Sequence, residues 1–311
     1  MIAVVTGANG LIGRALCSEL KRRNVAVRAA IRSAAAAGFP FDEIVTIGDI
    51  GPLTDWSAAV DGADVVFHIA GIAHLRSLSA ADRERLRAVN VGGTKSLVEA
   101  SERAGIRKFV LLSTAKVHGE NSGRVRFRER DRENPSDEYA RAKLEAEQIA
   151  RGMLGTRCVA VRTPLVYGPG VKANFLSLLR AVDRRVPLPF GAIDNERTLI
   201  FSGNLAHAMA HLGFLADSSD IYLAGDTPPM STPQLLRAIG AALQKKPLLI
   251  PVPASMLLVA GSLLGQRRRI EKIIGSFALD TSRLQATGWR PPFTIEEGLT
   301  RTADWFRSTQ R

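Results

Sequence analysis

Three glycines between an apolar run and an amphipathic stretch constrain the fold of this chain more than any other feature of its sequence. Residues 2–5 are all apolar and predict a buried strand, and the apolar spacing of residues 11–22 predicts a helix. The turn between them contains Gly7, Gly10 and Gly13. Glycines allow the backbone to approach a ligand closely, and the N–H groups and dipole of a helix N-terminus favour a pyrophosphate. The strand-turn-helix setting therefore predicts a dinucleotide-binding site.

Short apolar runs alternate with helical patterns through the first two-thirds of the chain. Strands are predicted at residues 2–5, 25–31, 44–47, 64–69, 108–113 and 158–162, and helices at 11–22, 81–104 and 136–153. This alternation predicts an α/β fold, a Rossmann-type doubly wound parallel sheet with a smaller C-terminal substrate-binding lobe. We expect a dinucleotide-binding domain at residues 1–170, to which residues 200–222 return. The proline-punctuated segments 171–199 and 223–311 would form the second lobe.

Composition narrows the class of protein. The chain has 311 residues, of which 46% are apolar, enough for a large core. Cys17 and Cys158 lie in apolar patterns without metal-ligand spacing to the five histidines, which predicts reduced core thiols of a cytoplasmic protein and no metal site. The net charge is +12, but no stacking aromatic residues interleave with the basic clusters at 124–132 and 267–269. That pattern argues against a nucleic-acid partner.

The longest apolar stretch, residues 248–264, is interrupted by Pro251 and Pro253. The uninterrupted part is too short to cross a bilayer. It predicts a buried helix rather than one lying at a membrane interface, and no stable membrane insertion.

A second motif carries acid–base chemistry. Tyr139 and Lys143 are four residues apart in a predicted helix, so their side chains are neighbours on one face. A free phenol has a pKa near 10 and is a poor base at neutral pH. We expect Lys143, together with the positive nicotinamide ring of an oxidised cofactor, to lower the pKa of Tyr139 into a range useful for general acid–base work. An exposed helical pair without chemistry is the alternative.

The residues after the second predicted strand bear on cofactor choice. NAD sites usually place an acidic residue there to bind the ribose 2′-hydroxyl. This chain has Arg32 and Ser33 instead, so Arg32 could meet a 2′-phosphate, with Ser33 or Arg28 helping. The pattern slightly favours NADP over NAD, and the alternative is that Arg32 merely stacks on the adenine.

Strings spread over nearly the whole chain resemble a known family, the extended short-chain dehydrogenase/reductases, and within it the nucleotide-sugar epimerase/dehydratase branch. The matching strings are residues 6–13, 48–50, 68–71, 90–94, 113–119, 139–143 and 162–170. The resemblance implies a cytoplasmic enzyme that binds a dinucleotide and a UDP-sugar. It also implies a homodimer formed through the helices near 81–104 and 136–153.

The resemblance assigns expected roles to individual residues. Those expected to hold the cofactor, with Arg32 added for its position, are Gly7, Asn9, Gly10, Leu11, Ile12, Gly13, Arg32, Asp49, Ile50, Ala70, Gly71, Tyr139, Lys143, Pro164 and Val166. The expected catalytic set is Thr114, Tyr139 and Lys143, with Asn90 bracing the site and Ser113 a weaker candidate for the role of Thr114. The expected substrate contacts are Thr114, Lys116, Asn174 and Arg197. For Arg197, a surface ion pair with Glu196 or Asp194 is the alternative.

Three reactions share such a site. A 4,6-dehydratase of this branch carries an Asp-Glu pair after the catalytic Thr, but Ala115 and Lys116 follow Thr114 here. A finer resemblance to bacterial UDP-N-acetylquinovosamine 4-ketoreductases favours reduction of a UDP-4-keto-6-deoxy-hexosamine in surface polysaccharide biosynthesis. A UDP-glucose or UDP-N-acetylglucosamine 4-epimerase is the alternative, and a non-catalytic cofactor-sensing protein is a remote one. His118 stands where the branch often has Tyr, and we expect a packed or hydrogen-bonded side chain there.

Overall fold

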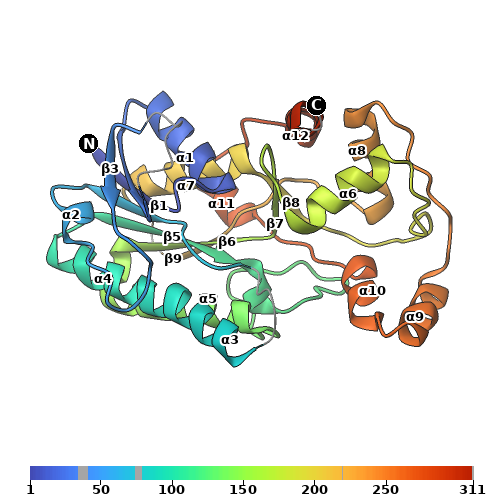
Figure 1. The fold of residues 1–311 in the computed structure, drawn as a ribbon, viewed down its shortest axis with the longest axis horizontal. Coiled ribbons are helices and arrows are strands. Elements are labelled where there is room, and N and C mark those ends of the chain that lie inside the picture. Colours follow the sequence, from blue (N-terminus) through green and yellow to red (C-terminus); the bar gives the residue numbers. More distant parts are fainter. Residues whose placement is uncertain (34–40, 74–78, 219, 310–311) are drawn as a thin grey trace.

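A parallel sheet of seven strands forms the centre of the computed structural model, which describes residues 1–33, 41–73, 79–218 and 220–309 (Figure 1). The strands are β1 (Ile2–Thr6), β2 (Ala26–Ile31), β3 (Glu43–Thr46), β4 (Val65–His68), β5 (Lys108–Thr114), β6 (Cys158–Thr163) and β9 (Asp220–Leu223). Their order is β3-β2-β1-β4-β5-β6-β9, and all pairings are parallel. The predicted doubly wound sheet is confirmed.

Helices cover both faces of this sheet, with α1 (Leu11–Arg22) and α7 (Ser202–Phe214) on one face and α4 (Gly93–Arg103) and α5 (Glu138–Leu154) on the other (Figure 1). Side chains of β1 alternate between the two cores. Ala3 and Val5 pack with residues of α1 and α7, whereas Val4 packs with residues of α4 and α5. Burial on both faces explains why the strands are apolar throughout.

The second lobe lies beside the carboxyl ends of the strands. Its helices are α6 (Ala173–Asp183), α8 (Thr232–Leu243), α9 (Ala254–Leu263), α10 (Arg267–Ile274) and α12 (Ile295–Thr309), and two short strands, β7 (Leu165–Tyr167) and β8 (Leu199–Phe201), pair in parallel. Phe175, Leu236 and Phe306 unite α6, α8 and α12 in a separate core. Between β8 and α8 the chain returns to the main sheet and forms α7 and β9. The fold also contains two short helices, α2 (Ser57–Val60) and α11 (Ser282–Ala286).

The long helix predicted at residues 81–104 is confirmed over residues 80–103, but it contains one widened turn. The chain forms α3 (Ala80–Arg87), then a π-helical turn over Ala88–Gly92, then α4. The hydroxyl of Thr94 donates to the carbonyl of Asn90 at 2.7 Å, a side-chain bond of the kind that perturbs helices. The spacing of the apolar residues was not sufficient to predict this single widened turn. Such turns are frequent at functional sites.

Helix α9 also departs from expectation, because one of its faces is not buried. Leu257 and Gly261 are buried, but Met256, Val259 and Leu263 are 61%, 62% and 83% exposed. A helix that is apolar on every side has no periodicity to indicate which face the core covers. Among the described residues, no helix is both long enough and apolar enough to cross a membrane.

A buried histidine ties the carboxyl ends of β1 and β4 to α4. The Nδ1 atom of His68 lies 2.8 Å from the Thr6 hydroxyl, and Nε2 lies 3.0 Å from the Thr94 hydroxyl. Because Thr94 already donates to the carbonyl of Asn90, it accepts from Nε2–H, and Thr6 donates to Nδ1. Burial, reinforced by the charge of Lys143, lowers the pKa of His68 to about 3. The ring is therefore neutral in the folded protein at physiological pH.

We expect His68→Gln to weaken the dependence of stability on pH. Between about pH 6.5 and 3 the unfolded chain binds a proton at His68 that the folded chain does not, so the free energy of unfolding falls as the pH decreases. This loss reaches about 1.4 kcal/mol per pH unit within that window. Urea denaturation of both proteins at pH 7, 6 and 5 measures it. Parallel pH slopes for the two proteins would contradict a neutral His68.

Candidate active site

The carboxyl ends of β1 and β4 border the place where the sheet order reverses, since β2 lies on one side of β1 and β4 on the other. Ligands of doubly wound sheets bind in the crevice outside such a point. Gly7 follows β1 with φ +67°, and a Cβ atom there would lie 2.9 Å from the backbone nitrogen of Ala70 after β4. A Cβ at Gly13 would lie 2.1 Å from the carbonyl oxygen of Gly7. The turn packs backbone against backbone, which only glycine permits at these two positions.

The residues at this turn fit a dinucleotide. Helix α1 begins after Gly10, which provides no side-chain cap for the first N–H groups of the helix. The buried Oδ1 atom of Asn9 has no hydrogen-bond partner among the described residues. An uncapped helix N-terminus suits a pyrophosphate, and an orphaned buried acceptor suits a ligand hydroxyl or amide.

The end of β2 presents Arg32 and Ser33 to solvent. The guanidinium of Arg32 lies 3.8 Å from the carboxylate of Asp49, and both side chains are exposed. Arg28 cannot assist at this position, because its guanidinium is bound by Glu43 at 2.6 Å and by two backbone carbonyls. That part of the sequence prediction is therefore wrong. Residues 34–40, which follow, lie outside the described residues.

The other residues expected near the cofactor occupy the same edge of the sheet. Ala70 is buried, Gly71 is exposed, and Ile50, Pro164 and Val166 are half-buried. Asn90, fully buried in the π-helical turn, accepts from the backbone N–H of Ile72 at 2.8 Å and donates to its carbonyl at 2.9 Å. Asn90 thereby holds the segment that follows β4.

Tyr139 and Lys143 lie at the start of α5, next to the carboxyl end of β5. The carboxylate of Asp137 caps this helix by accepting from the N–H of Ala140 at 2.8 Å. Tyr139 is half-buried in the first turn, and Lys143 is buried one turn later. Thr114, the last residue of β5, is buried and accepts from the N–H of Lys116 at 3.3 Å. None of the hydrogen bonds among the described residues ends on the Tyr139 phenol or the Lys143 ammonium group, which leaves both available.

The charges of the protein alone keep the phenol protonated. Burial, together with the negative charge of Asp137, raises the pKa of Tyr139 to about 12. Burial lowers the pKa of Lys143 to about 8, although the carboxylate of Glu147 opposes this shift. In the protein without a cofactor, Lys143 does not bring the pKa of Tyr139 below its usual value, because desolvation and Asp137 dominate. Tyr139 is a proton donor at neutral pH.

Lys116 is engaged by two carboxylates. Its ammonium lies 3.1 Å from Glu120 and 3.0 Å from Asp137. Although burial lowers the pKa of Lys116, these two partners raise it overall. Lys116 therefore stays charged and helps to hold the N-terminal cap of α5.

The two residues expected to meet the phosphates of a substrate lie in the second lobe. Asn174 is exposed in the first turn of α6. Arg197 is half-buried, and its Nη1 donates to the backbone carbonyls of Lys272 at 2.7 Å and Gly275 at 3.0 Å. The alternative of an ion pair with Glu196 is not observed, because Glu196 pairs with Arg126 at 3.3 Å.

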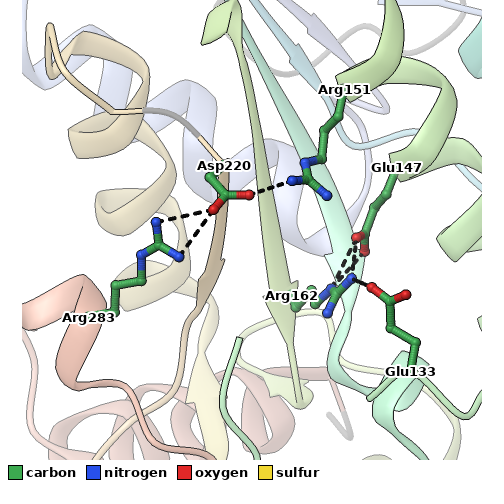
Figure 2. Close-up of polar contacts among 6 residues, drawn as sticks. All are labelled: Glu133, Glu147, Arg151, Arg162, Asp220 and Arg283. Carbon is green, nitrogen blue, oxygen red and sulfur yellow. Dashed lines mark hydrogen bonds and ion pairs between the residues drawn. The ribbon is translucent and has the colours of Figure 1, made fainter. Parts of the chain in front are cut away.

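A buried polar group that was not predicted from the sequence supports Tyr139 and Lys143. Glu147 and Arg162 are fully buried, and Nη2 and Nε of Arg162 donate to the carboxylate of Glu147 at 2.7 and 3.0 Å (Figure 2). Ser113 also donates to Glu147, so its hydroxyl is occupied there. The spacing held a signal, since residues 139, 143 and 147 follow one another at helical intervals of four.

Two further contacts complete this buried group. Glu133 accepts from Arg162 at 2.6 Å (Figure 2). His118 lies 3.0 Å from Nη1 of Arg162 and stacks on Phe127 at a ring separation of 5.5 Å. Burial and the charge of Arg162 lower the pKa of His118 to about 4, so it is neutral and accepts the hydrogen bond. The expectation of a packed, hydrogen-bonded His118 is confirmed.

A second ion pair anchors the same helix. Arg151, one turn beyond Glu147, donates to Asp220 of β9 at 2.5 Å, and Arg283 donates to the same carboxylate at 3.3 Å (Figure 2). Helix α5 is thus fixed to β6 through Glu147 and to β9 through Arg151. These contacts determine where Tyr139 and Lys143 lie relative to Thr114.

Known proteins share this architecture. The family described as NAD dependent epimerase/dehydratase matches residues 3–225. The chain is 32% identical to a UDP-glucose 4-epimerase of Vibrio cholerae, over 97% of this chain and 94% of that protein. It is 23% identical to N-acetyl-alpha-D-glucosaminyl-diphospho-ditrans,octacis-undecaprenol 4-epimerase of Escherichia coli O157:H7, over 85% and 84% of the two chains. The solved structure of MoeE5 in complex with UDP-glucose and NAD has the same fold, with a TM-score of 0.76, 23% identity and complete coverage of both chains.

We expect Glu147→Gln to lower the free energy of unfolding by about 3–5 kcal/mol, because it weakens the pairing of a fully buried guanidinium. Glu133→Gln is the matched control. It removes a partially exposed partner of Arg162 but leaves Glu147 in place, so a loss of about 1 kcal/mol or less is expected. Urea denaturation compares the two variants. Equal losses would show that Glu147 is not the principal partner of Arg162.

Proposed function

Because this chain belongs to the NAD dependent epimerase/dehydratase family, we propose that it transfers hydride at C4 of a UDP-activated sugar. We propose further that its net reaction is reduction of a UDP-4-keto-6-deoxy-hexosamine used for surface polysaccharides. The observation that carries this proposal is the placement of Tyr139 and Lys143, one turn apart at the start of α5, beside a sheet edge that suits a dinucleotide. Reduction of a carbonyl requires a proton donor at the start of the reaction.

The residues then have distinct tasks. A bound nicotinamide cofactor supplies the hydride that carbon C4 accepts. Tyr139 gives its proton to oxygen O4, so the ketone becomes an alcohol and the phenol becomes a phenolate. Thr114 donates a hydrogen bond to the same oxygen. Lys143, kept largely cationic by Glu147, stabilises the phenolate after the transfer.

The ends of the crevice suit a charged cofactor and a charged substrate. Arg32, exposed at the end of β2 where an acidic residue would favour NAD, supports NADPH as the reductant. Arg197 uses only Nη1 for its bonds to carbonyls among the described residues, which leaves Nε and Nη2 for a diphosphate. We also propose a homodimer in which the exposed faces of α4 and α5 form the interface.

A UDP-sugar 4-epimerase is the second candidate. The Vibrio cholerae relative favours it, since that protein is named a UDP-glucose 4-epimerase and is alike over almost the whole chain. Epimerisation begins with oxidation, which requires Tyr139 as a base. The phenol must then lose its proton first, which the positive ring of a bound oxidised nicotinamide would favour.

Product analysis separates the two reactions. The purified protein is incubated with a UDP-4-keto-6-deoxy-N-acetylhexosamine and NADPH or NADH, and separately with UDP-glucose or UDP-N-acetylglucosamine without reductant. A reductase consumes one reduced cofactor for each alcohol formed and leaves the second pair unchanged. C4 epimers formed without added reductant would contradict net reduction and assign the epimerase.

We expect Tyr139→Phe to decrease kcat about 10²- to 10⁴-fold, because the proton donor is lost while the ring remains. Cofactor affinity, measured by calorimetric titration, should be nearly unchanged. Tyr222→Phe is the control, since the Tyr222 ring packs against Arg283 and contributes no group to the crevice. A wild-type rate for Tyr139→Phe would refute the acid–base role and favour a cofactor-sensing protein.

A further inference from the structure

Helix α9 carries a continuous apolar stripe on its outer face. Its members are Met256, Val259, Ala260 and Leu263, which follow one another at helical spacing, and Leu264 continues the stripe with 75% exposure. These side chains, with Ser255, line a shallow apolar depression. Single exposed apolar residues are ordinary, but a contiguous row marks an interaction surface.

The inner face of α9 already has its partner. Gly261 lies so close to α10 that a Cβ atom there would be 2.8 Å from Cγ1 of Ile270. Packing against α10 therefore explains the apolar residues of one face and leaves those of the other unexplained. The ten residues of α9 extend about 15 Å, half the hydrocarbon thickness of a bilayer. The helix can lie in an interface but cannot span one.

Positively charged residues flank the stripe in the sequence. Residues 245–275 contain six lysines and arginines and a single acidic residue, Glu271. Arg267 and Arg268, in the first turn of α10, are exposed, and Arg267 pairs with Glu271 at 2.9 Å. Lys245 and Lys246 precede two more exposed apolar side chains, Leu248 and Ile250. Exposed apolar and cationic side chains thus alternate along this segment of the chain.

This surface lies where a planar partner can reach it. Helices α9 and α10 form the end of the molecule farthest from α2 and β3, beyond the carboxyl ends of the strands (Figure 1). The end of α10 is anchored, because Asn195 donates to the carbonyls of Ile273 and Gly275 at 3.2 and 3.0 Å. The hairpin is therefore a projecting element with a fixed base.

We propose that α9 and α10 dock the protein reversibly onto a bilayer that contains anionic phospholipid. The apolar stripe enters the boundary between headgroups and acyl chains, and Arg267 and Arg268 contact the phosphates. The positive charge of Arg267 and Arg268 favours anionic phospholipid over a second copy of the chain as the partner of this surface. A two-fold contact brings the same patch of both copies together, which would place two cationic surfaces face to face. The docking does not depend on which reaction the crevice performs.

Flotation of the full-length protein with vesicles tests the proposal. We expect binding to vesicles of equal parts phosphatidylcholine and phosphatidylglycerol, little binding to phosphatidylcholine alone, and weaker binding as salt rises. Val259→Gln combined with Leu263→Gln should reduce the partition coefficient at least about ten-fold. Arg267→Gln combined with Arg268→Gln should reduce it by a similar factor, about five-fold for each charge.

Matched controls have equally exposed side chains elsewhere. Leu53→Gln with Val125→Gln replaces apolar residues that are 94% and 70% exposed, and Arg22→Gln with Arg107→Gln replaces exposed arginines. Both controls should bind vesicles as the wild type does. The α9 and α10 variants should turn over a soluble nucleotide sugar at the wild-type rate, which separates a failure of docking from a failure of the proposed reaction.

Three results would overturn the proposal. The first is an absence of binding to the anionic vesicles. The second is an equal loss of binding in the control variants. The third is a change of oligomeric state in the Val259→Gln, Leu263→Gln variant without a change in vesicle binding, which would assign the stripe to a second copy of the chain.

Discussion

The buried ion pair between Glu147 and Arg162 is the interaction on which the arrangement of the crevice depends. It joins the middle of α5 to β6 with both partners fully buried. A buried guanidinium is tolerated only when its donors are satisfied, and Glu133, His118 and Glu147 together achieve this. Since α5 also carries Tyr139 and Lys143, the same pair that neutralises Arg162 fixes their position at the sheet edge.

The ion pair also governs charge in the crevice. Arg162 pairs with Glu147, and the Glu147 carboxylate opposes the fall in the pKa of Lys143 that burial causes. Without it, Lys143 would lose its proton more readily and could not stabilise a phenolate. At the N-terminus of the same helix, burial and the charge of the capping residue Asp137 raise the pKa of Tyr139. One helix thus holds a neutral acid and a tuned cation one turn apart.

The sequence predicted the sheet well because its signals are local. Apolar runs of four to six residues and a glycine turn specify strands, crossovers and a phosphate-binding edge without knowledge of distant contacts. The features it missed depend on tertiary structure. The pairing of Glu147 with Arg162 requires the register that places Ser113 beside Arg162 in the sheet. Helix α9 is apolar on every side, so its sequence does not indicate which face the core covers, and the widened turn at Asn90 depends on contacts with distant residues such as Ile72.

A chain of polar contacts links the two lobes. Asp137, which caps α5, binds Lys116, and Lys116 binds Glu120. Glu120 then binds Lys272 of α10 at 3.1 Å, while the backbone carbonyl of that lysine accepts from Arg197. The C-terminal end of α10 is therefore connected to the cap of α5 through Glu120 and Lys116. It is also bound by Arg197, the arginine proposed to meet a diphosphate. Because α10 also packs against α9, the surface proposed to meet a bilayer is joined to the reaction site by packing and by polar contacts.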